Sequence, residues 1–492
     1  MPLLKVDPFA VTVSRRPIAV DLFAGAGGMS LGFEMAGFDV AVAVEIDPIH
    51  CLTHQYNFPQ GAVLCRSAAE VTGAEIRQQL AAVLRGDRPS DSALTHHAKG
   101  QTRQQSIDLL PIATTGPSLQ PAAIELGLEE PELEIDVLFG GPPCQGFSMM
   151  GKRAFDDPRN ALMFHFARLV NELRPKYFVI ENVRGMTLGK HRAFLGELID
   201  LFADFGYQVE ANYQVLNAAH YGVPQDRQRL FLLGARSGWP LPSYPAPQTR
   251  RPPVCKSAKR DRTLAHLPIC PTVAGAIGDL PDVDHYPELR SSDWLDLGQL
   301  ADPPGDYARW LRGALRDPAD FSHPRRSRRS GLSGCLRTDH SAASVARFQT
   351  TPSGEVDRIS RFLKLHPEGI CNTLRAGTPS NRGAFTSPRP IHPIQGRCIT
   401  VREAARLHSY PDWFCFHGTK WHGMRQIGNS VPPLLARAVA AQVRSCLPGE
   451  PTLPDRPLIT GDPQWLSYTM SQAADFYAVS RHAIAPRRRQ GS

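Results

Sequence analysis

Cys144 is the residue in this sequence best placed to act as a nucleophile. It ends the run Asp136-Val-Leu-Phe-Gly-Gly-Pro-Pro-Cys, which reads as a short apolar strand followed by a glycine–proline loop. In open α/β sheets ligands bind at the carboxyl ends of the strands, and successive prolines restrict the backbone that presents the thiol. A cysteine in an apolar run is more commonly a small core residue. The loop position favours a reactive thiol, which must be deprotonated or activated to attack at neutral pH.

Three other charged side chains could act beside that thiol. Glu181 interrupts an apolar strand at its carboxyl end, in Val-Ile-Glu-Asn-Val, which favours a side chain pointing into a cleft over an ordinary surface residue. Arg227 and Arg229 alternate in Gln-Asp-Arg-Gln-Arg and share a face if this stretch is extended. Two guanidiniums on one face suit a phosphate or a base edge, although the stretch alone could equally be a solvated basic segment.

A glycine turn supplies a third candidate site. Gly25-Ala-Gly-Gly follows a β-prone run, and Glu45 ends the next strand, where an acidic side chain can bind ribose hydroxyls. The pair favours an adenosine-bearing cofactor without identifying it. A nicotinamide-dependent oxidoreductase remains a competitor, although the turn does not match G-x-G-x-x-G. A purely structural turn is the other alternative.

The elements that must position these residues alternate between strand and helix. Residues 17–47 read as strand, glycine turn, helix and strand, with Gly37 as the helix stop. Further strands are expected at 136–139, 177–181, 208–216 and 229–235, and helices at 161–173, 193–205, 401–408 and 432–447. This alternation predicts an α/β fold whose mostly parallel sheet is covered on both faces.

The rhythm fails over residues 85–132, which we interpret as an insertion, and over 241–395, which have many prolines and arginines and no regular period. We therefore expect a first part of the catalytic domain at 1–240, a second, loop-rich domain at 241–395, the catalytic C-terminal part at 396–446 and an extension at 447–492.

Composition narrows the class of protein only modestly. The chain has 492 residues and a formal net charge of +8, with arginine-rich runs at 250–262 and 325–337 that suit a polyanion or a solvated surface. Ten cysteines form no CxxC pair, so neither a metal site nor a disulfide framework is expected. No segment resembles a signal peptide or a membrane span. We expect a soluble cytoplasmic protein.

Six segments, in this order, closely resemble the DNA (cytosine-5) methyltransferase family over roughly residues 17–236 and 397–446. They are Asp21-Leu-Phe-Ala-Gly-Ala-Gly-Gly, Gly141-Pro-Pro-Cys-Gln-Gly-Phe-Ser148, Glu181-Asn-Val, Gln225-Asp-Arg-Gln-Arg229, Arg402-Glu-Ala-Ala-Arg-Leu407 and Gln426-Ile-Gly-Asn-Ser-Val-Pro-Pro433. The resemblance implies a Rossmann-like S-adenosylmethionine-dependent methyltransferase fold and a smaller, irregular target-recognition domain at 241–395.

The resemblance also implies a mechanism. Cys144 adds to C6 of a cytosine flipped out of the duplex, Glu181 hydrogen-bonds or protonates N3, and C5 then accepts the methyl group of S-adenosyl-L-methionine, leaving S-adenosyl-L-homocysteine. Arg229 and Arg227 hold the base and Glu181 in register. The family pattern places the remaining substrate contacts at Gln145, Ser148, Thr373 and Leu374.

For the cofactor, the family pattern assigns the methionine and glycine-loop contacts, the ribose, the adenine, the sulfonium and the closing segment. In that order, these are Phe23, Ala24, Gly25 and Gly27; Glu45; Ile46; Pro142; and Asn429 and Ser430. The chain departs from the family after the third strand, where Ser67 stands in place of the usual adenine-contacting Asp. Either Ser67 or the main chain makes that contact, or it is absent and cofactor affinity suffers.

The implied substrate is double-stranded DNA, with the arginine-rich runs contacting phosphates. The implied setting is a bacterial restriction–modification pair, in which the chain acts as a monomer and need not bind the endonuclease. A tRNA cytosine-5 methyltransferase is the alternative enzyme, but the long basic segment favours duplex DNA. A catalytically inactive DNA-binding relative is disfavoured because Cys144, Glu181 and both arginines are present.

Overall fold

The computed structural model describes residues 15–86, 133–143, 161–187, 191–210, 212–255, 261–296, 301–303, 305–377 and 389–481. One mixed sheet organises them, in the strand order β3-β2-β1-β4-β5-β9-β6, with β7 also paired to β9. The strands are β1 (Ile18–Leu22), β2 (Asp39–Glu45), β3 (Ala62–Cys65), β4 (Val137–Gly140), β5 (Tyr177–Val183), β6 (Tyr207–Val209), β7 (Gln214–Asn217) and β9 (Gln228–Arg236). The first five are mutually parallel, whereas β9 runs antiparallel to β5, β6 and β7.

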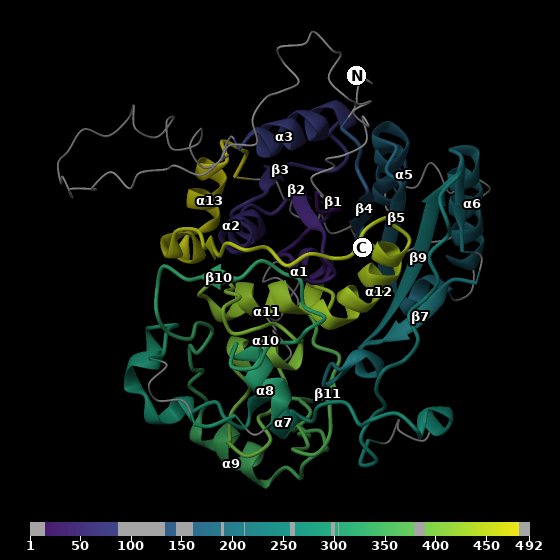
Figure 1. The fold of residues 1–492 in the computed structure, drawn as a ribbon. Coiled ribbons are helices and arrows are strands. Elements are labelled where there is room, and N and C mark those ends of the chain that lie inside the picture. Colours follow the sequence, from purple (N-terminus) through teal and green to yellow (C-terminus); the bar gives the residue numbers. More distant parts are fainter. Residues whose placement is uncertain are drawn as a thin grey trace, which may run out of the picture.

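Helices cover both faces of this sheet (Figure 1). One face packs on α3 (Gly73–Arg85), α5 (Ala161–Leu173) and α6 (His191–Asp204), and the other on α1 (Gly28–Met35) and α12 (Pro433–Ser445). The predicted α/β fold with a mostly parallel, doubly covered sheet is therefore confirmed. Helix α12 comes from the far end of the chain, and it packs so closely on α1 that a Cβ on Gly32 would lie 2.4 Å from the Cβ of Ala436.

Local chemistry explains where several elements begin and end. The helix α2 (Pro48–Asn57) starts with Asp47, whose carboxylate accepts the Ile49 amide, and with a proline at its first position. Helix α1 ends before Gly37, which has a φ of +95°, as the sequence predicts. The strand expected at 208–216 is wrong as one element, because β6 and β7 pair with separate halves of β9.

Residues 241–395 contain only short elements in their described parts, and lie below the sheet in Figure 1. They are α7 (Val273–Ile277), α8 (Asp306–Leu311), α9 (Ala342–Thr350), the strands β10 (Arg325–Arg326) and β11 (Cys371–Asn372), and short 3₁₀ turns. The next segment forms α10 (Val401–Leu407) and α11 (Lys420–Asn429). A separate apolar cluster joins α7 to α10 and α11.

The C-terminal extension folds back onto both the irregular segment and the sheet-bearing part of the chain. Its strand β12 (Leu458–Ile459) pairs with β10, and its helix α13 (Met470–Phe476) packs against α2, as Figure 1 also shows. Ala473 is fully buried in that contact, together with Ile49 and Leu52 of α2. The described part of the extension is therefore a structural element of the fold.

An ion pair buried between segments 291 residues apart ties the second half of the chain to α1. The guanidinium of Arg325 and the carboxylate of Glu34 are both 0% exposed and lie 2.8 Å apart, with a second hydrogen bond of 2.8 Å between them. Burial alone would raise the pKa of Glu34, but Arg325 reverses that effect and lowers it. Replacing Arg325 would leave an uncompensated buried charge.

We expect Arg325→Met to destabilise the protein by about 3–5 kcal/mol, the usual effect of removing one partner of a buried ion pair. The matched control is Arg326→Met, because Arg326 is the next residue of β10 and is exposed. Thermal unfolding followed by circular dichroism compares the two variants with the parent. Equal midpoints for both variants would show that the pair is dispensable.

Candidate functional site

The carboxyl ends of four parallel strands form the edge where the candidate site lies. In the sheet register Leu22 of β1 pairs with Val44 of β2 and with Gly140 of β4, and Gly140 pairs with Ile180 of β5. The glycine turn, Glu45, the Gly-Pro-Pro loop and Glu181 follow or end these strands. The structure thus brings four of the sequence motifs to one edge.

The glycine turn after β1 is held in an unusual backbone conformation. Phe23 has a φ of +61°, a region that non-glycine residues adopt rarely and that recurs at ligand sites. The Ala24 amide donates to the Val44 carbonyl over 3.1 Å. Gly27 has a φ of +99°, and a Cβ there would lie 2.3 Å from the Phe58 ring, whereas a Cβ on Gly25 would meet no atom within 4 Å. Open space therefore lies above Gly25.

Glu45 faces this turn from the end of β2. One carboxylate oxygen accepts the Gly25 amide at 2.8 Å, and the other accepts the amides of Ile46 and Asp47 at 2.9 Å. These three bonds fix the carboxylate while leaving it lone pairs for hydroxyl groups. The Ile46 side chain beside it is 39% exposed, an apolar surface next to a fixed acid.

The segment after α11 closes the turn from the opposite side. A Cβ on Gly28 would lie 2.5 Å from the Val431 carbonyl oxygen and 2.9 Å from the Cβ of Ser430, so the two segments are in contact. The Ser430 hydroxyl donates to the Ile427 carbonyl, and Asn429 is exposed. Two segments far apart in the sequence therefore meet at the glycine turn.

Glu181 lies buried on β5, 8% exposed, and forms an ion pair with Arg229 of β9 over 2.7 Å. Burial raises the pKa of Glu181, and the positive charges of Arg229 and Arg227 offset only part of that effect. A carboxyl group with a raised pKa carries a proton more often at neutral pH than a free glutamate does. Such a group can donate a hydrogen bond to a basic ring nitrogen.

The loop that leads to Cys144 packs directly on this carboxyl group. A Cβ on Gly141 would lie 2.7 Å from Glu181 Oε2, so only glycine fits there without displacing the acid. The Asn182 amide donates to the Pro142 carbonyl over 3.0 Å and fixes the loop. Cys144, Gln145 and Ser148 lie outside the described residues.

Arg227 occupies a different place from Arg229. Its guanidinium is fully buried and donates to the carbonyls of Leu374, Gly428 and Ser430, at 2.8, 2.9 and 2.7 Å. Burial, together with Arg229, lowers its pKa well below the usual value. These contacts hold Arg227 between the end of the irregular segment and the closing segment.

Thr373 and Leu374 contact the same strip of chain. The Thr373 hydroxyl donates to the Asp226 carbonyl over 2.6 Å, and the Leu374 amide donates to the side chain of Gln225. The strand β11 pairs here with β8 (Gln225–Asp226). Since Leu374 is also buried, both expected substrate residues lie against β8.

Ser67 follows β3, and its hydroxyl oxygen accepts the Ala69 amide at 3.2 Å. It caps the turn that precedes α3 and has one remaining hydroxyl proton to donate.

Asn182 and Gln225, two residues of the quoted motifs to which the sequence assigned no role, hold parts of the candidate site in place. Asn182 fixes the Pro142 carbonyl, and the Gln225 amide donates to the Leu407 carbonyl while its oxygen accepts the Leu374 amide. The available signal was an amide side chain within a buried strand, because such a group must find hydrogen-bond partners.

The expectation that the arginine-rich runs contact phosphate is wrong for two of their members. Arg325 is buried against Glu34, and Arg251 is 4% exposed, 3.7 Å from Asp261. The sequence showed the charges but could not show the carboxylates that neutralise them. Within the described residues, no three His, Cys, Asp or Glu side chains cluster as metal ligands, and no helix has the length and apolarity to span a membrane.

Known proteins share these features along most of the chain. It is 49% identical to the Type II methyltransferase M.XorII of Xanthomonas oryzae pv. oryzae, over 96% of this chain and 95% of that protein. The Type II methyltransferase M1.HphI of Haemophilus parahaemolyticus is 32% identical, over 86% of each chain. A solved DNA modification methyltransferase of E. coli, encoded within a prophage, is 30% identical with a TM-score of 0.58, over 87% of this chain and 99% of that chain.

The family model of the C-5 cytosine-specific DNA methylases matches residues 18–86 and 123–445. That match includes the glycine turn, Glu181 with its arginine partner, and the closing segment at the edge of the sheet. The chain therefore belongs to the C-5 cytosine-specific DNA methylase family.

Proposed function

We propose that this chain transfers a methyl group from S-adenosyl-L-methionine to C5 of a flipped cytosine within a specific duplex DNA sequence. One observation carries the proposal: a buried glutamate, ion-paired to Arg229, lies under the loop that ends in Cys144. Cys144 follows Pro143 directly in the sequence. A thiol and a carboxyl group can then approach one pyrimidine ring together.

The residues at the glycine turn suit the proposed cofactor. S-adenosyl-L-methionine supplies an electrophilic methyl group. The open space above Gly25 and the oriented carboxylate of Glu45 suit its amino-acid and ribose parts, and Ile46 offers an apolar contact for adenine. Phe23, Ala24, Gly27, Pro142, Asn429 and Ser430 complete the proposed contacts. Ser67 takes the place of the usual acid beside adenine.

The side chains divide the chemistry at the cytosine. The Cys144 thiolate forms a bond to C6, and Glu181 gives a proton or hydrogen bond to N3, so that C5 becomes nucleophilic. Once C5 carries the methyl group, its proton leaves to a base and the sulfur–C6 bond breaks, which restores the aromatic ring and the thiolate. Arg229 orients Glu181 throughout, and Arg227 positions the segments around them. Gln145, Ser148, Thr373 and Leu374 line the proposed substrate side.

The biological setting follows from the relatives' names. Type II methyltransferases are the modification partners of restriction endonucleases, and we propose the same role here, for a cytoplasmic monomer that needs no direct contact with the endonuclease. Bisulfite sequencing of DNA from a host that expresses the chain tests this directly. Methylated cytosines in one sequence context support the proposal. If the DNA stays unmethylated while tRNA accepts a labelled methyl group, the chain is instead a tRNA cytosine-5 methyltransferase.

We expect Cys144→Ser to abolish methyl transfer, because a hydroxyl is a far weaker nucleophile than a thiolate at neutral pH. Duplex DNA with 5-fluorocytosine at the target should trap the parent protein covalently, since fluorine cannot leave as the C5 proton does. Denaturing electrophoresis detects the adduct. An adduct that persists in the serine variant would show that another residue attacks the ring.

We expect Glu181→Gln to lower kcat by about 10²–10⁴-fold, the usual contribution of a general acid, with little change in DNA affinity. The working form of Glu181 is protonated, so the parent rate should fall as the pH rises through its raised pKa. The glutamine variant keeps its hydrogen but does not titrate, so this alkaline fall should vanish. Parent and variant profiles of the same shape would contradict a protonated Glu181.

We expect Gly28→Ala to weaken binding of S-adenosyl-L-homocysteine about tenfold or more, because the new Cβ must push the Val431 carbonyl away from the turn. Gly196→Ala is the control, since a Cβ at that position of α6 meets nothing within 4 Å. Isothermal titration calorimetry measures both. Unchanged affinity in the Gly28 variant would mean that the closing segment does not shape the cofactor site.

A further inference from the structure

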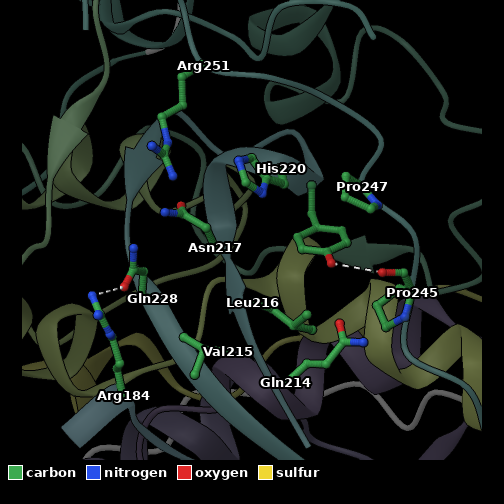
Figure 2. Close-up of a pocket in the computed structure, with 11 residues that line it drawn as sticks. Arg184, Gln214, Val215, Leu216, Asn217, His220, Gln228, Pro245, Pro247 and Arg251 are labelled. Carbon is green, nitrogen blue, oxygen red and sulfur yellow. Dashed lines mark hydrogen bonds between the residues drawn. The ribbon is translucent and has the colours of Figure 1, made fainter. Parts of the chain in front are cut away.

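A hollow of about 410 Å³ lies beside the catalytic edge and is not used by the chemistry above. It is lined by β7 and the 3₁₀ turn η4 (Ala218–Tyr221), with Pro245 and Pro247 on one side and Arg251 on the other (Figure 2). Arg184, from the 3₁₀ turn η3 (Arg184–Thr187) after β5, and Gln228, the first residue of β9, complete its polar wall.

The hollow lies at the same end of the sheet as Glu181. Val183 of β5 pairs with Arg229 of β9, and Arg229 pairs in turn with Leu216 of β7. Because neighbouring strands are about 4.8 Å apart, the lining of β7 lies about 10 Å across the sheet from the strand that carries Glu181. A DNA strand rises about 3.4 Å per nucleotide, so this distance corresponds to a few nucleotides.

The exposed side chain of Arg184 gives the hollow a positive charge that solvent can reach. Arg184 is exposed, and its hydrogen bond of 3.1 Å goes to the Gln228 amide oxygen, a neutral group that does not balance the charge. Arg251 is balanced by Asp261, which also contacts His220 at 3.3 Å. Burial lowers the pKa of His220, so its imidazole is neutral at pH 7. Arg184 therefore provides the cation that a ligand can reach.

A second hollow of comparable size, about 490 Å³, shows why arginines alone do not make a site. It lies near Arg77, Arg174 and Arg236, at the opposite end of the sheet. Those guanidiniums donate to carbonyl oxygens of the protein itself: Arg77 to Leu133 and Leu173, Arg174 to Phe205, and Arg236 to Arg174. They are occupied in holding the fold, whereas the Arg184 guanidinium donates, among the residues that the structure describes, to the neutral Gln228 amide.

We infer that the β7 hollow binds a backbone phosphate of the DNA strand, a few nucleotides from the flipped cytosine, with Arg184 as the main contact. Val215, 36% exposed, offers an apolar surface for the deoxyribose next to that phosphate. The volume falls in the range of pockets that hold one small ligand unit, such as a sugar phosphate. The inference rests on the proposed function and names the part of the protein that anchors the DNA backbone.

The salt dependence of duplex DNA binding tests the inference without requiring catalysis. Fluorescence anisotropy with a labelled duplex gives the dissociation constant over a series of salt concentrations. Arg184→Gln should weaken binding and reduce the slope of log K against log salt by about one, the effect of losing one phosphate contact. Val215→Lys adds a cation at the same hollow and should steepen the slope by about the same amount.

The matched control is Arg85→Gln, which makes the same charge change at an exposed position at the end of α3. It should leave the slope at the parent value. Equal slopes for Arg184→Gln, Arg85→Gln and the parent would overturn the inference, provided that circular dichroism shows all three folded.

Duplexes with one neutral methylphosphonate near the target cytosine then locate the contact. At one position the methylphosphonate should weaken DNA binding by the parent protein. It should not weaken binding by the Arg184→Gln variant any further, because the two changes remove the same interaction. Full, additive losses at every position would also overturn the inference. Methyl transfer to unmodified DNA is measured with the same preparations: its absence in the parent refutes the proposed function, whereas normal transfer with unaltered salt slopes refutes only the phosphate site.

Discussion

The ion pair between Arg229 and Glu181 is the constraint on which the rest of the site depends. A carboxyl group that is 8% exposed would be poorly oriented on its own, but the guanidinium at 2.7 Å holds it at a defined place between two strands. Gly141 has no side chain to displace it, and Asn182 holds the next carbonyl of the loop. The geometry of the loop before Cys144 is thereby set by β5, a rigid central strand.

Arg227 holds two further segments of the chain beside this ion pair. Its buried guanidinium binds the carbonyls of Leu374, Gly428 and Ser430, so the end of the irregular segment and the segment that closes the glycine turn share one anchor. A buried cation that contacts only neutral acceptors is unfavourable unless its hydrogen bonds are well made. A change of position in either segment would break these bonds, so one side chain links the irregular segment to the segment that closes the glycine turn.

The motifs allowed most of the catalytic edge to be predicted, because each depends on local backbone rules. A strand followed by glycines or by Pro-Pro predicts a loop at the carboxyl end, and parallel strands bring such loops together. The partners of isolated charges could not be predicted in this way. The sequence around Arg325 predicts a surface cation. In the structure Arg325 is paired with the carboxylate of Glu34, 291 residues away. The helix α2 was not predicted either, because its apolar residues are buried by the distant C-terminal extension.

Strand β9 carries neighbouring side chains of the candidate site and of the β7 hollow. Successive side chains of a strand point to opposite sides, so Arg229 turns to Glu181 while Gln228 turns to Arg184 at the β7 hollow. The distance between the base site and the proposed phosphate site is therefore fixed by covalent geometry and by the pairing of β5, β9 and β7. An enzyme that must extrude a base gains from such a fixed distance, because an anchored backbone limits the motion of the nucleotide that swings out.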